Sequence, residues 1–392
     1  MLLKKTVLPE PYIAYNSEHL NYDYQSVKNL LPSGSALLYS LKANNNYDLI
    51  MSLSKICDGF DIASPAELDI IARAEVRSKI IMLTGHDKYN INPALLKRLS
   101  IFNQIIYSVE SENDFELFLA YNHEVSSIQA IIRISFSPPA EYGIYNGLPA
   151  SHFGITPENL CIFLNSGRIS PSAISGFHFY IGSQIKEISM FPDVIAHCLD
   201  LTEQIKKNTN IAIKNINFGG GFPAPFASRD NLHLTEKNTS ISQKTTEIIK
   251  SRLAFNTQVI FESGRAIISR CGKLHCSISD INLTASLPYV IINTGISQVS
   301  GLYLARRIKP AAMEFFIRNE DPDVQSQSCD YLTLRVYGNS CTALDFLGLL
   351  YYVDEYQPAI GTDLICYHVG AYCASAGLNG FHAKSKINEV VA

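Results

Sequence analysis

Short apolar runs and longer amphipathic segments alternate along the chain from about residue 36. The short runs have the length of β-strands, and in the segments between them apolar residues recur at helical spacing. The predicted strands occupy eight ranges: 36–43, 59–64, 79–84, 104–109, 129–135, 174–183, 213–221 and 258–264. The clearest predicted helices occupy 65–74, 111–122, 191–207 and 242–256. Eight strands that alternate with helices predict an α/β fold, a (β/α)8 barrel.

The pattern changes in the C-terminal third of the chain. Strand-like runs follow there without long helices between them, at 273–283, 288–295, 331–340 and 363–372. They predict a second, mainly β domain. We therefore expect a barrel over residues 17–268 and a β-sandwich or barrel-like domain built from residues 1–16 and 269–392. The polar, turn-rich stretches 222–241 and 317–329 are expected to be loops.

Composition narrows the classes of function. The chain has 392 residues, of which 47% are hydrophobic and 17% charged, and its net charge is −4 without a basic cluster. This argues against nucleic acid as the main partner, because phosphate neutralisation requires concentrated Lys and Arg. No apolar run reaches the roughly 18 residues of a membrane span, and the N-terminus lacks a secretory signal pattern. The nine cysteines occur without CxxC pairs, so we expect no metal site and a reducing, cytoplasmic location.

Polar residues recur where the predicted strands end, which is where functional groups lie in such a barrel. They are Lys42, Asp61, Ser64, Arg133, His178, Ser183, Gly219, Gly220, Gly221, Glu262 and Arg265. Each has an ordinary structural interpretation by itself, such as a surface lysine, a core histidine or a tight turn. Ser64 with Glu67, for example, forms a capping box at a helix start. Their shared location is what indicates a site.

These residue types meet the requirements of pyridoxal 5'-phosphate (PLP). Lys42 follows an apolar run, so we expect a buried amine nucleophile with a lowered pKa. The glycines 219–221 allow backbone N–H groups to approach a phosphate, and Arg265 adds a cation. Glu262 is the candidate carboxylate for keeping the pyridine nitrogen protonated. His178 is expected to stack on the ring.

In this order the residues resemble the motifs of the fold type III PLP decarboxylases, which act on ornithine, arginine or diaminopimelate. The motifs are SLKAN around Lys42, GFDIAS..E (59–67), RIS (133–135), HFG (152–154), HFYIGS (178–183), FGGGF (218–222), ESGR (262–265), C...D (341–345) and GAY (370–372). The resemblance extends from about Tyr12 to about Phe381. It implies an alanine racemase-like barrel with a β domain, and a homodimer with shared active sites.

The resemblance also implies roles for individual residues. Lys42 would hold PLP as a Schiff base, His178 would stack on its ring, and Glu262 would pair with its ring nitrogen. The phosphate would be bound by Ser183, Gly219, Gly220, Gly221, Gly264, Arg265 and Tyr372. Cys341 of the second subunit would protonate the carbanion after CO2 leaves, whereas Asp61 and Arg133 would support the region around Lys42. Alanine racemases place an arginine at the ring nitrogen, so Glu262 favours decarboxylation.

Several positions depart from the better-known members of this family. Thr342 and Ala343 follow Cys341, where diaminopimelate decarboxylases have Glu-Ser and ornithine-type enzymes have an aspartate directly after the cysteine. The obvious anionic partner of a free diamino substrate is therefore missing. Asp345 remains, but the family uses it mainly for structure. His152 replaces a Lys or Arg, which weakens an expected ion pair between subunits, and ESGR replaces EPGR with little expected effect.

The motifs look most similar to decarboxylases of specialised biosynthesis, of the butirosin and microcin C type. These act on an amino-acid group that is already attached to a carrier protein or a peptide-nucleotide. Arg306 and Arg307 are candidates for contacting a phosphate of such a conjugate, with a solvated surface pair as the alternative. The chain stops near the end of the family's common core, and whether a further fused domain follows residue 392 is left open by the sequence. The alternatives are a decarboxylase of free diaminopimelate, ornithine or lysine, an amino-acid racemase, and a non-enzymatic PLP carrier.

Overall fold

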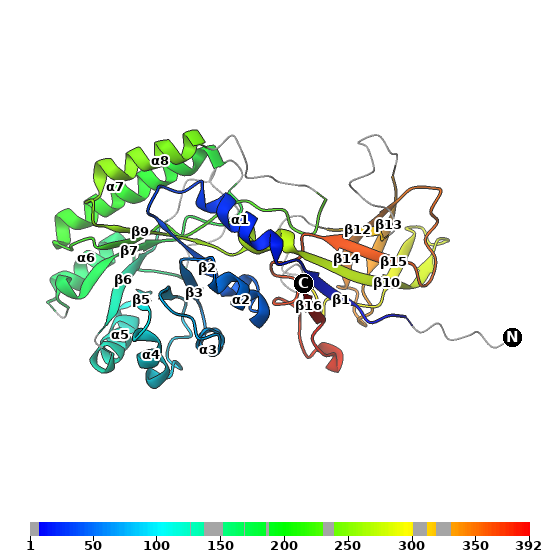
Figure 1. Cartoon of the computed structure of the whole chain (residues 1–392), viewed down its shortest axis with the longest axis horizontal. Helices are drawn as coiled ribbons and strands as arrows, with labels where there is room; N and C mark the ends of the chain where they lie inside the picture. Colours follow the sequence, from blue (N-terminus) through cyan, green and yellow to red (C-terminus); the bar gives the residue numbers. More distant parts are fainter. Residues whose placement is uncertain are drawn as a thin grey trace. The chain divides into compact units, whose positions relative to one another are not determined.

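The computed structural model describes residues 8–125, 127–136, 152–167, 169–185, 188–229, 239–300, 312–318 and 331–392. The chain divides into two compact units. Unit 1 comprises Met1–Leu20, Ala224–Leu232 and Ile268–Ala392, and unit 2 comprises Asn21–Pro223 and His233–Ile267. Each unit has its own sheet (Figure 1).

Unit 2 is built on a closed barrel of parallel strands, which confirms the predicted (β/α)8 fold (Figure 1). The strands are β2 (Ala36–Ser40), β3 (Gly59–Ile62), β4 (Ile80–Leu83), β5 (Gln104–Val109), β6 (Ile128–Ile134), β7 (Ile174–Phe179), β8 (Asn215–Asn217) and β9 (Gln258–Ser263). The helices are α1 (Glu18–Lys28), α2 (Tyr47–Ser54), α3 (Pro65–Arg73), α4 (Pro93–Ser100), α5 (Glu112–Glu124), α6 (Pro157–Asn165), α7 (Phe191–Thr209), α8 (Thr239–Arg252) and α9 (Arg265–Ile268). Helix α1 begins before the first residue of this unit, Asn21, and α9 ends after its last residue, Ile267.

Most predicted strands extend beyond the observed ones; the strand predicted at 174–183, for example, ends at Phe179, so Ser183 lies beyond β7. Two further differences bear on the site. The strand predicted at 36–43 ends at Ser40, and Lys42 lies in a short 3-10 helix, η1 (Leu41–Ala43). The strand predicted at 213–221 is reduced to β8, because Gly219 and Gly221 adopt positive φ angles that end the extended conformation. Both segments therefore turn immediately beyond the barrel wall.

Side-chain caps start the helices soon after the strands end. Ser64, Ser111 and Thr156 each accept a backbone N–H in the first turn of α3, α5 and α6. In α3 the predicted capping box is present in a modified form: Ser64 Oγ accepts the Glu67 N–H, and Glu67 Oε2 accepts the Ala63 N–H at 2.7 Å. These caps fix short connections at the carboxyl ends of the strands.

The barrel interior is apolar in its middle. The buried core cluster consists of Ala36, Leu38, Ile80, Met82, Ile106, Ile131 and Ile260. These residues come from five strands, and side chains of this kind fill a barrel of eight strands completely. The barrel is thus a packed core, and any site must lie at one of its ends.

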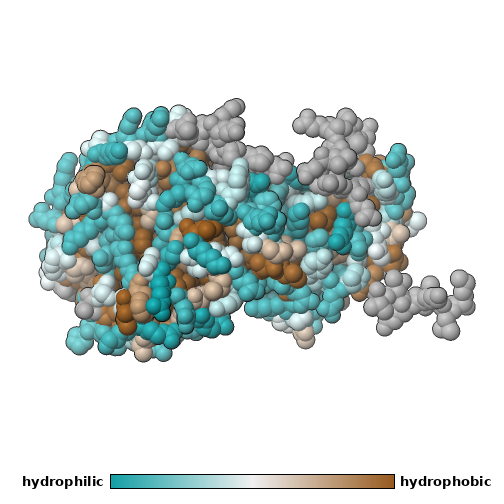
Figure 2. Space-filling model, viewed as in Figure 1, coloured by the Kyte–Doolittle hydropathy of each residue, from teal (hydrophilic) through white to brown (hydrophobic). Residues whose placement is uncertain are grey.

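Unit 1 contains a mixed sheet in the order β11-β13-β14-β12-β15-β10-β1-β16, with a further pairing of β11 and β10. Its strands are β1 (Tyr12–Tyr15), β10 (Gly272–Asn282), β11 (Tyr289–Ile292), β12 (Met313–Ile317), β13 (Leu332–Tyr337), β14 (Phe346–Tyr352), β15 (Asp363–Tyr367) and β16 (Asn388–Val391). This agrees with the predicted mainly β domain, although β1, β12, β14 and β16 were not predicted as strands. On the face that Figure 2 shows, hydrophobic residues are interspersed with hydrophilic ones. No helix of the described ranges has the length and apolar character that crossing a membrane requires.

Candidate active site

Polar side chains follow the apolar core at the carboxyl end of the barrel. Alternate residues of a strand face the same side of a sheet, so a residue two positions beyond a core residue lies on the same face one level further along. Four strands continue in this way into buried polar residues: Met82 is followed by Thr84, Ile106 by Ser108, Ile131 by Arg133 and Ile260 by Glu262. The strand register that builds the core therefore also places this polar layer.

Glu262 is a buried carboxyl group at the end of β9. Its Oε1 atom accepts a hydrogen bond from Asn217 Nδ2 at 2.6 Å and lies 3.5 Å from His178 Nε2. Burial raises the pKa of Glu262 well above its ordinary value, and the negative charge of Asp61 acts in the same direction. A carboxyl group in this state binds a proton or a cationic partner strongly.

His178 lies on β7 with its ring buried. Its Nδ1 atom is 2.9 Å from Ser108 Oγ. Burial lowers the pKa of His178 well below its ordinary value, and the charges of Arg133, Lys42 and Lys88 lower it further. The imidazole is therefore neutral at pH 7, and its Nε2 has no hydrogen-bond partner among the described residues. A neutral, fixed aromatic ring is suited to packing against another planar group.

Lys42 and Asp61 form an ion pair across adjacent strands. Lys42 Nζ lies 3.6 Å from Asp61 Oδ2, and Thr84 donates a hydrogen bond of 2.6 Å to Asp61 Oδ1. The Asp61 side chain is 1% exposed, but that of Lys42 is 48% exposed in the isolated chain. The expectation of a buried Lys42 is thus wrong, because η1 carries the residue past the end of β2. The amine is accessible, with the buried carboxylate of Asp61 beside it.

Arg133 is held by a buried carboxylate and two aromatic rings. Its Nη1 atom donates to Glu110 Oε1 at 3.0 Å, and the guanidinium carbon lies 4.5 Å from the ring centre of Phe153 and 5.4 Å from that of Tyr180. Such cation–π contacts fix the plane of a guanidinium group. Arg133 thus forms a rigid wall beside His178, its Cα partner in the pairing of β6 with β7.

The glycine triplet is required by close packing against neighbouring strand ends. A Cβ atom on Gly220 would lie 2.2 Å from the Glu262 carbonyl oxygen, and one on Gly219 would lie 2.6 Å from that of Phe179. The Gly219 N–H donates to Asn217 Oδ1 at 2.7 Å. The Gly221 carbonyl accepts the Ile185 N–H at 2.9 Å, which joins the triplet to the loop that carries the half-buried Ser183.

Gly264 and Arg265 follow β9 directly. A Cβ atom on Gly264 would lie 2.7 Å from Ala43 Cβ and 3.2 Å from the Ser40 carbonyl oxygen, so a glycine lets the ends of β9 and β2 approach each other. Arg265 is buried and begins α9. The structure therefore brings together, in unit 2, the predicted residues from Lys42 to Arg265.

Two predicted site residues, Cys341 and Tyr372, belong to unit 1. Cys341 is exposed, in a turn that Asp345 holds by accepting the N–H groups of Ile296 at 2.9 Å and Ser340 at 2.7 Å. The mainly structural interpretation of Asp345 agrees with these bonds. Tyr372 has a φ angle of 57°, an uncommon conformation for a residue with a side chain.

Three other residues were singled out in the sequence. His152 is exposed and lies 5.6 Å, ring centre to ring centre, from His86. Arg306 and Arg307 lie outside the described residues.

The sequence analysis missed four residues that hold the site together. They are Thr84, Ser108, Glu110 and Asn217. Each lies at or just beyond the carboxyl end of a strand, and Thr84 and Ser108 are two positions beyond a core residue. That spacing was available in the sequence and could have indicated them.

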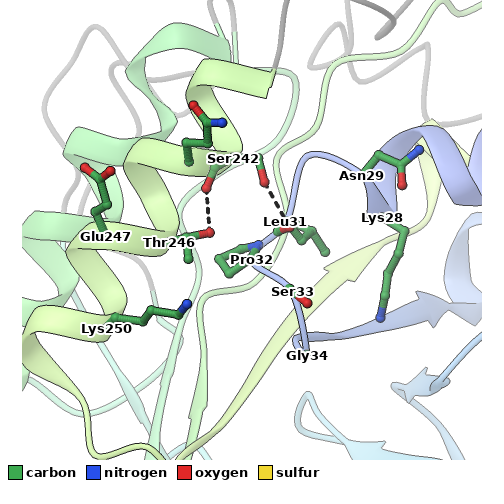
Figure 3. A pocket seen from close by; sticks show the side chains of 11 residues that line it. Lys28, Asn29, Leu31, Pro32, Ser33, Gly34, Ser242, Thr246, Glu247 and Lys250 are labelled. Carbon is green, nitrogen blue, oxygen red and sulfur yellow. Dashed lines mark hydrogen bonds between the residues drawn. The ribbon is translucent and has the colours of Figure 1, made fainter.

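A cavity at the opposite end of β2 has a different character. It has a volume of about 610 Å³ and lies between the segment after α1 and helix α8 (Figure 3). Three of its polar side chains are already bonded: Ser242 donates to the Leu31 carbonyl, Thr246 donates to that of Ser242, and Lys28 pairs with Asp58 outside the cavity. This cavity has no convergence of groups comparable to that around Glu262.

Comparison with known proteins adds an independent line of evidence. Residues 17–269 match the family model described as "Pyridoxal-dependent decarboxylase, pyridoxal binding domain". The chain is 24% identical over 361 residues to diaminopimelate decarboxylase of Haemophilus influenzae, which covers 91% of this chain and 81% of that protein. It is also 24% identical over 373 residues to L-glutamyl-[BtrI acyl-carrier protein] decarboxylase of Niallia circulans, which covers 92% of this chain and 84% of that protein.

Solved structures show the same fold. Diaminopimelate decarboxylase from Helicobacter pylori complexed with L-lysine aligns with a TM-score of 0.76 at 17% identity, over 98% of this chain and 92% of that chain. Lysine/ornithine decarboxylase from Vibrio vulnificus complexed with putrescine aligns with a TM-score of 0.74 at 19% identity, over 97% of this chain and 94% of that chain.

Proposed function

Because this chain belongs to the family of pyridoxal-dependent decarboxylases, we propose that it removes the α-carboxylate from an amino-acid group that is attached to a larger molecule. The chain is a PLP-dependent decarboxylase. The proposal adds the identity of the residues that act and the class of substrate. Its main support is the buried, proton-binding carboxyl of Glu262, surrounded by a neutral imidazole, an accessible amine and a glycine turn.

The described residues fit PLP. His178 Nε2 and Glu110 Oε2 are buried polar atoms without hydrogen-bond partners among the described residues, as expected of a site whose ligand is absent. Lys42 would attach the cofactor, His178 would face its ring, and Glu262 would bind its ring nitrogen. Its phosphate would be held by Ser183, Gly219, Gly220, Gly221, Gly264, Arg265 and Tyr372. Bound PLP supplies the electron sink that stabilises the negative charge left by departing CO2.

The protein's own groups then have distinct tasks. Glu262 would hold a proton between its carboxyl and the ring nitrogen, because its burial disfavours the free carboxylate. Asn217 holds the Glu262 carboxyl in place through its 2.6 Å hydrogen bond. The Asp61 carboxylate balances the charge of the Lys42 amine, 3.6 Å away, and keeps that amine at the end of β2.

Cys341 is proposed as the acid that protonates the substrate carbon after decarboxylation, from the second subunit of a homodimer. Its exposed position agrees with a role outside its own subunit. Cys341→Ala should retain the cofactor and slow formation of the correct amine by about 10²-fold. Ser340→Ala, next to it in the same turn, is the matched control. Unchanged rates of amine release in Cys341→Ala would remove Cys341 from the reaction.

The substrate class is proposed from the turn after Cys341. Thr342 and Ala343 carry no charge, so this turn offers no anionic partner for the distal ammonium group of a free diamino acid. A relative of similar identity is named for action on a glutamyl group on an acyl-carrier protein. We infer that the substrate is conjugated. The specific case that we propose is a microcin C-like peptide-nucleotide intermediate, on which decarboxylation forms an aminopropyl group. We also propose a cytoplasmic location.

A second candidate is a decarboxylase of free diaminopimelate, ornithine or lysine. The names of several relatives favour it, since diaminopimelate decarboxylases of Haemophilus influenzae, Aquifex aeolicus and Methanocaldococcus jannaschii match most of the chain. Release of CO2 from free and from carrier- or nucleotide-linked amino acids, measured with added PLP, separates the two. Turnover of free diaminopimelate, ornithine or lysine without turnover of any conjugate would reject the conjugate proposal. Inversion without loss of CO2 would indicate a racemase instead.

A further inference from the structure

A buried ion pair outside the set of proposed cofactor ligands joins Lys88 to Asp114. The two side chains are 2% and 7% exposed, and Lys88 Nζ lies 2.7 Å from Asp114 Oδ2. Lys88 Nζ also donates to the Ser108 carbonyl oxygen and lies 4.4 Å from the centre of the Tyr107 ring. A lysine in this environment is held by directional contacts on several sides.

The charged groups of this pair contact the carboxyl end of β5 and the residue directly after it. Asp114 Oδ1 accepts the Tyr107 hydroxyl at 2.6 Å, and Asp114 Oδ2 accepts the Glu110 N–H at 2.8 Å. Together with the bond from Lys88 to the Ser108 carbonyl, these contacts fix the main chain from residue 107 to residue 110. Asp114 itself is anchored in the first turn of α5, where its N–H donates to Ser111 Oγ at 3.1 Å.

The same short segment carries the two side chains that hold His178 and Arg133. Ser108 Oγ lies 2.9 Å from His178 Nδ1, and Glu110 Oε1 accepts from Arg133 Nη1 at 3.0 Å. Ser108 and Glu110 are two residues apart, so their side chains lie on one face of the strand, whereas Tyr107 lies on the other face with Asp114. A change in the main chain on the outer side is therefore transmitted to the inner side.

We propose that Lys88 and Asp114 are positioning residues, which orient His178 and Arg133 through Ser108 and Glu110 for the reaction. The proposal rests on the function proposed for His178, although its test does not depend on turnover alone. Packing by itself does not require an ion pair here, because buried pairs can often be replaced by apolar residues of similar volume at little cost in stability. Polar contacts to residues 107, 108 and 110, at the end of β5 and directly after it, are what an apolar pair could not supply.

Three variants of the holoenzyme separate positioning from stability. Lys88→Met and Asp114→Asn each leave one partner buried without its counterpart, whereas the double variant removes the two charges together. We expect both single variants to lose stability and the double variant to regain most of it. Lys28→Met is the matched control, since Lys28 pairs with Asp58 in the same unit near the amino end of β2.

The double variant is the decisive sample. We expect kcat to fall about 10- to 100-fold, as for other residues that orient a functional side chain, with KM changed less than about threefold. The visible circular dichroism of bound PLP should also change, because this signal reports the orientation of the cofactor beside His178. Lys88→Arg, which keeps the charge, should restore part of both signals.

Recovery of kcat and of the circular dichroism in the double variant would overturn the proposal and leave the pair a structural role alone. Unchanged signals in both single variants would overturn it as well. If the wild-type enzyme turns over no tested substrate, the circular dichroism of bound PLP still decides the positioning role. Failure of the substrate proposal and failure of this inference are therefore distinguishable.

Discussion

Glu67 provides a direct test of the electrostatics around the site. Its carboxyl is buried in the first turn of α3. Burial raises the pKa of Glu67 to about 7; the hydrogen bond from the Ala63 N–H and the charge of Lys42 oppose this, whereas the charge of Asp61 adds to it. The perturbation that isolates this group is Glu67→Gln, because the amide oxygen can still accept the Ala63 N–H and the side-chain volume is retained.

The sign of the pH dependence follows from linkage. In the unfolded chain the Glu67 pKa is near 4.5, so between about pH 4.5 and 7 the folded state binds more protons than the unfolded state. The contribution of Glu67 to the free energy of unfolding is fully present below pH 4.5 and is lost as the pH rises to 7 and above. At about 1.4 kcal/mol per pH unit, the loss amounts to about 3 kcal/mol over this window.

Denaturant unfolding of the cofactor-free protein at several values between pH 4.5 and 8 measures this difference. Relative to wild type, Glu67→Gln should gain about 3 kcal/mol across the window, with an unchanged dependence on denaturant concentration. Glu116→Gln, at an exposed position of α5, is the control and should stay within about 0.5 kcal/mol of wild type. A difference between wild type and Glu67→Gln that does not vary with pH would refute the reasoning.

Three further changes test the proposed site. Lys42→Ala should abolish the visible absorbance of covalently bound cofactor after dialysis, with an unchanged far-ultraviolet circular dichroism spectrum, and a retained band would contradict its attachment there. Asn217→Ala leaves the Glu262 carboxyl and the Gly219 N–H without this hydrogen-bond partner. It should lower the free energy of unfolding, measured by chemical denaturation, by about 2–4 kcal/mol, whereas Asn90→Ala at an exposed position should change it very little. Equal effects of the two changes would argue against the network. Gly220→Ala brings a Cβ atom to 2.2 Å from the Glu262 carbonyl oxygen and should cost about 2 kcal/mol or more and weaken PLP binding measured by fluorescence titration. Gly34→Ala meets no atom within 4 Å but places an alanine at a φ of 85°, so it should lose some stability and leave PLP binding unchanged. An equal weakening of PLP binding in Gly34→Ala would show that the close contact is not the cause.

The barrel could be predicted because its signals are local. Each strand is a short apolar run, and the helices α2 to α6 begin with a capping residue such as Ser64. The limits of the strands were less predictable where the main chain turns. Leu41 and Ala43 are as apolar as the strand before them, yet they lie in η1, and nothing in their hydrophobicity distinguishes the two conformations.

Part of the site could be predicted for the same reason, and part could not. Glu262, His178 and Arg133 stand out as polar residues in apolar strands. Lys88 does not, because its burial depends on Asp114, which lies 26 residues further along the chain. Its neighbours in the sequence predict that Lys88 is a lysine in a polar loop. Only the tertiary fold shows that its charge is buried.

The dependence of the site on strand register has a physical consequence that goes beyond any single residue. Glu262 and Arg133 lie two positions beyond Ile260 and Ile131, so their orientation is set by the same alternation that buries the core. A shift of one residue in either strand would move an apolar side chain out of the core and the charged group to the outer face. Such a shift would expose apolar core residues as well as the charged group. The hydrophobic effect therefore holds the polar layer in place, although it does not favour a buried charge. The apolar core thus keeps a desolvated carboxyl at the end of β9, as the role proposed for Glu262 requires.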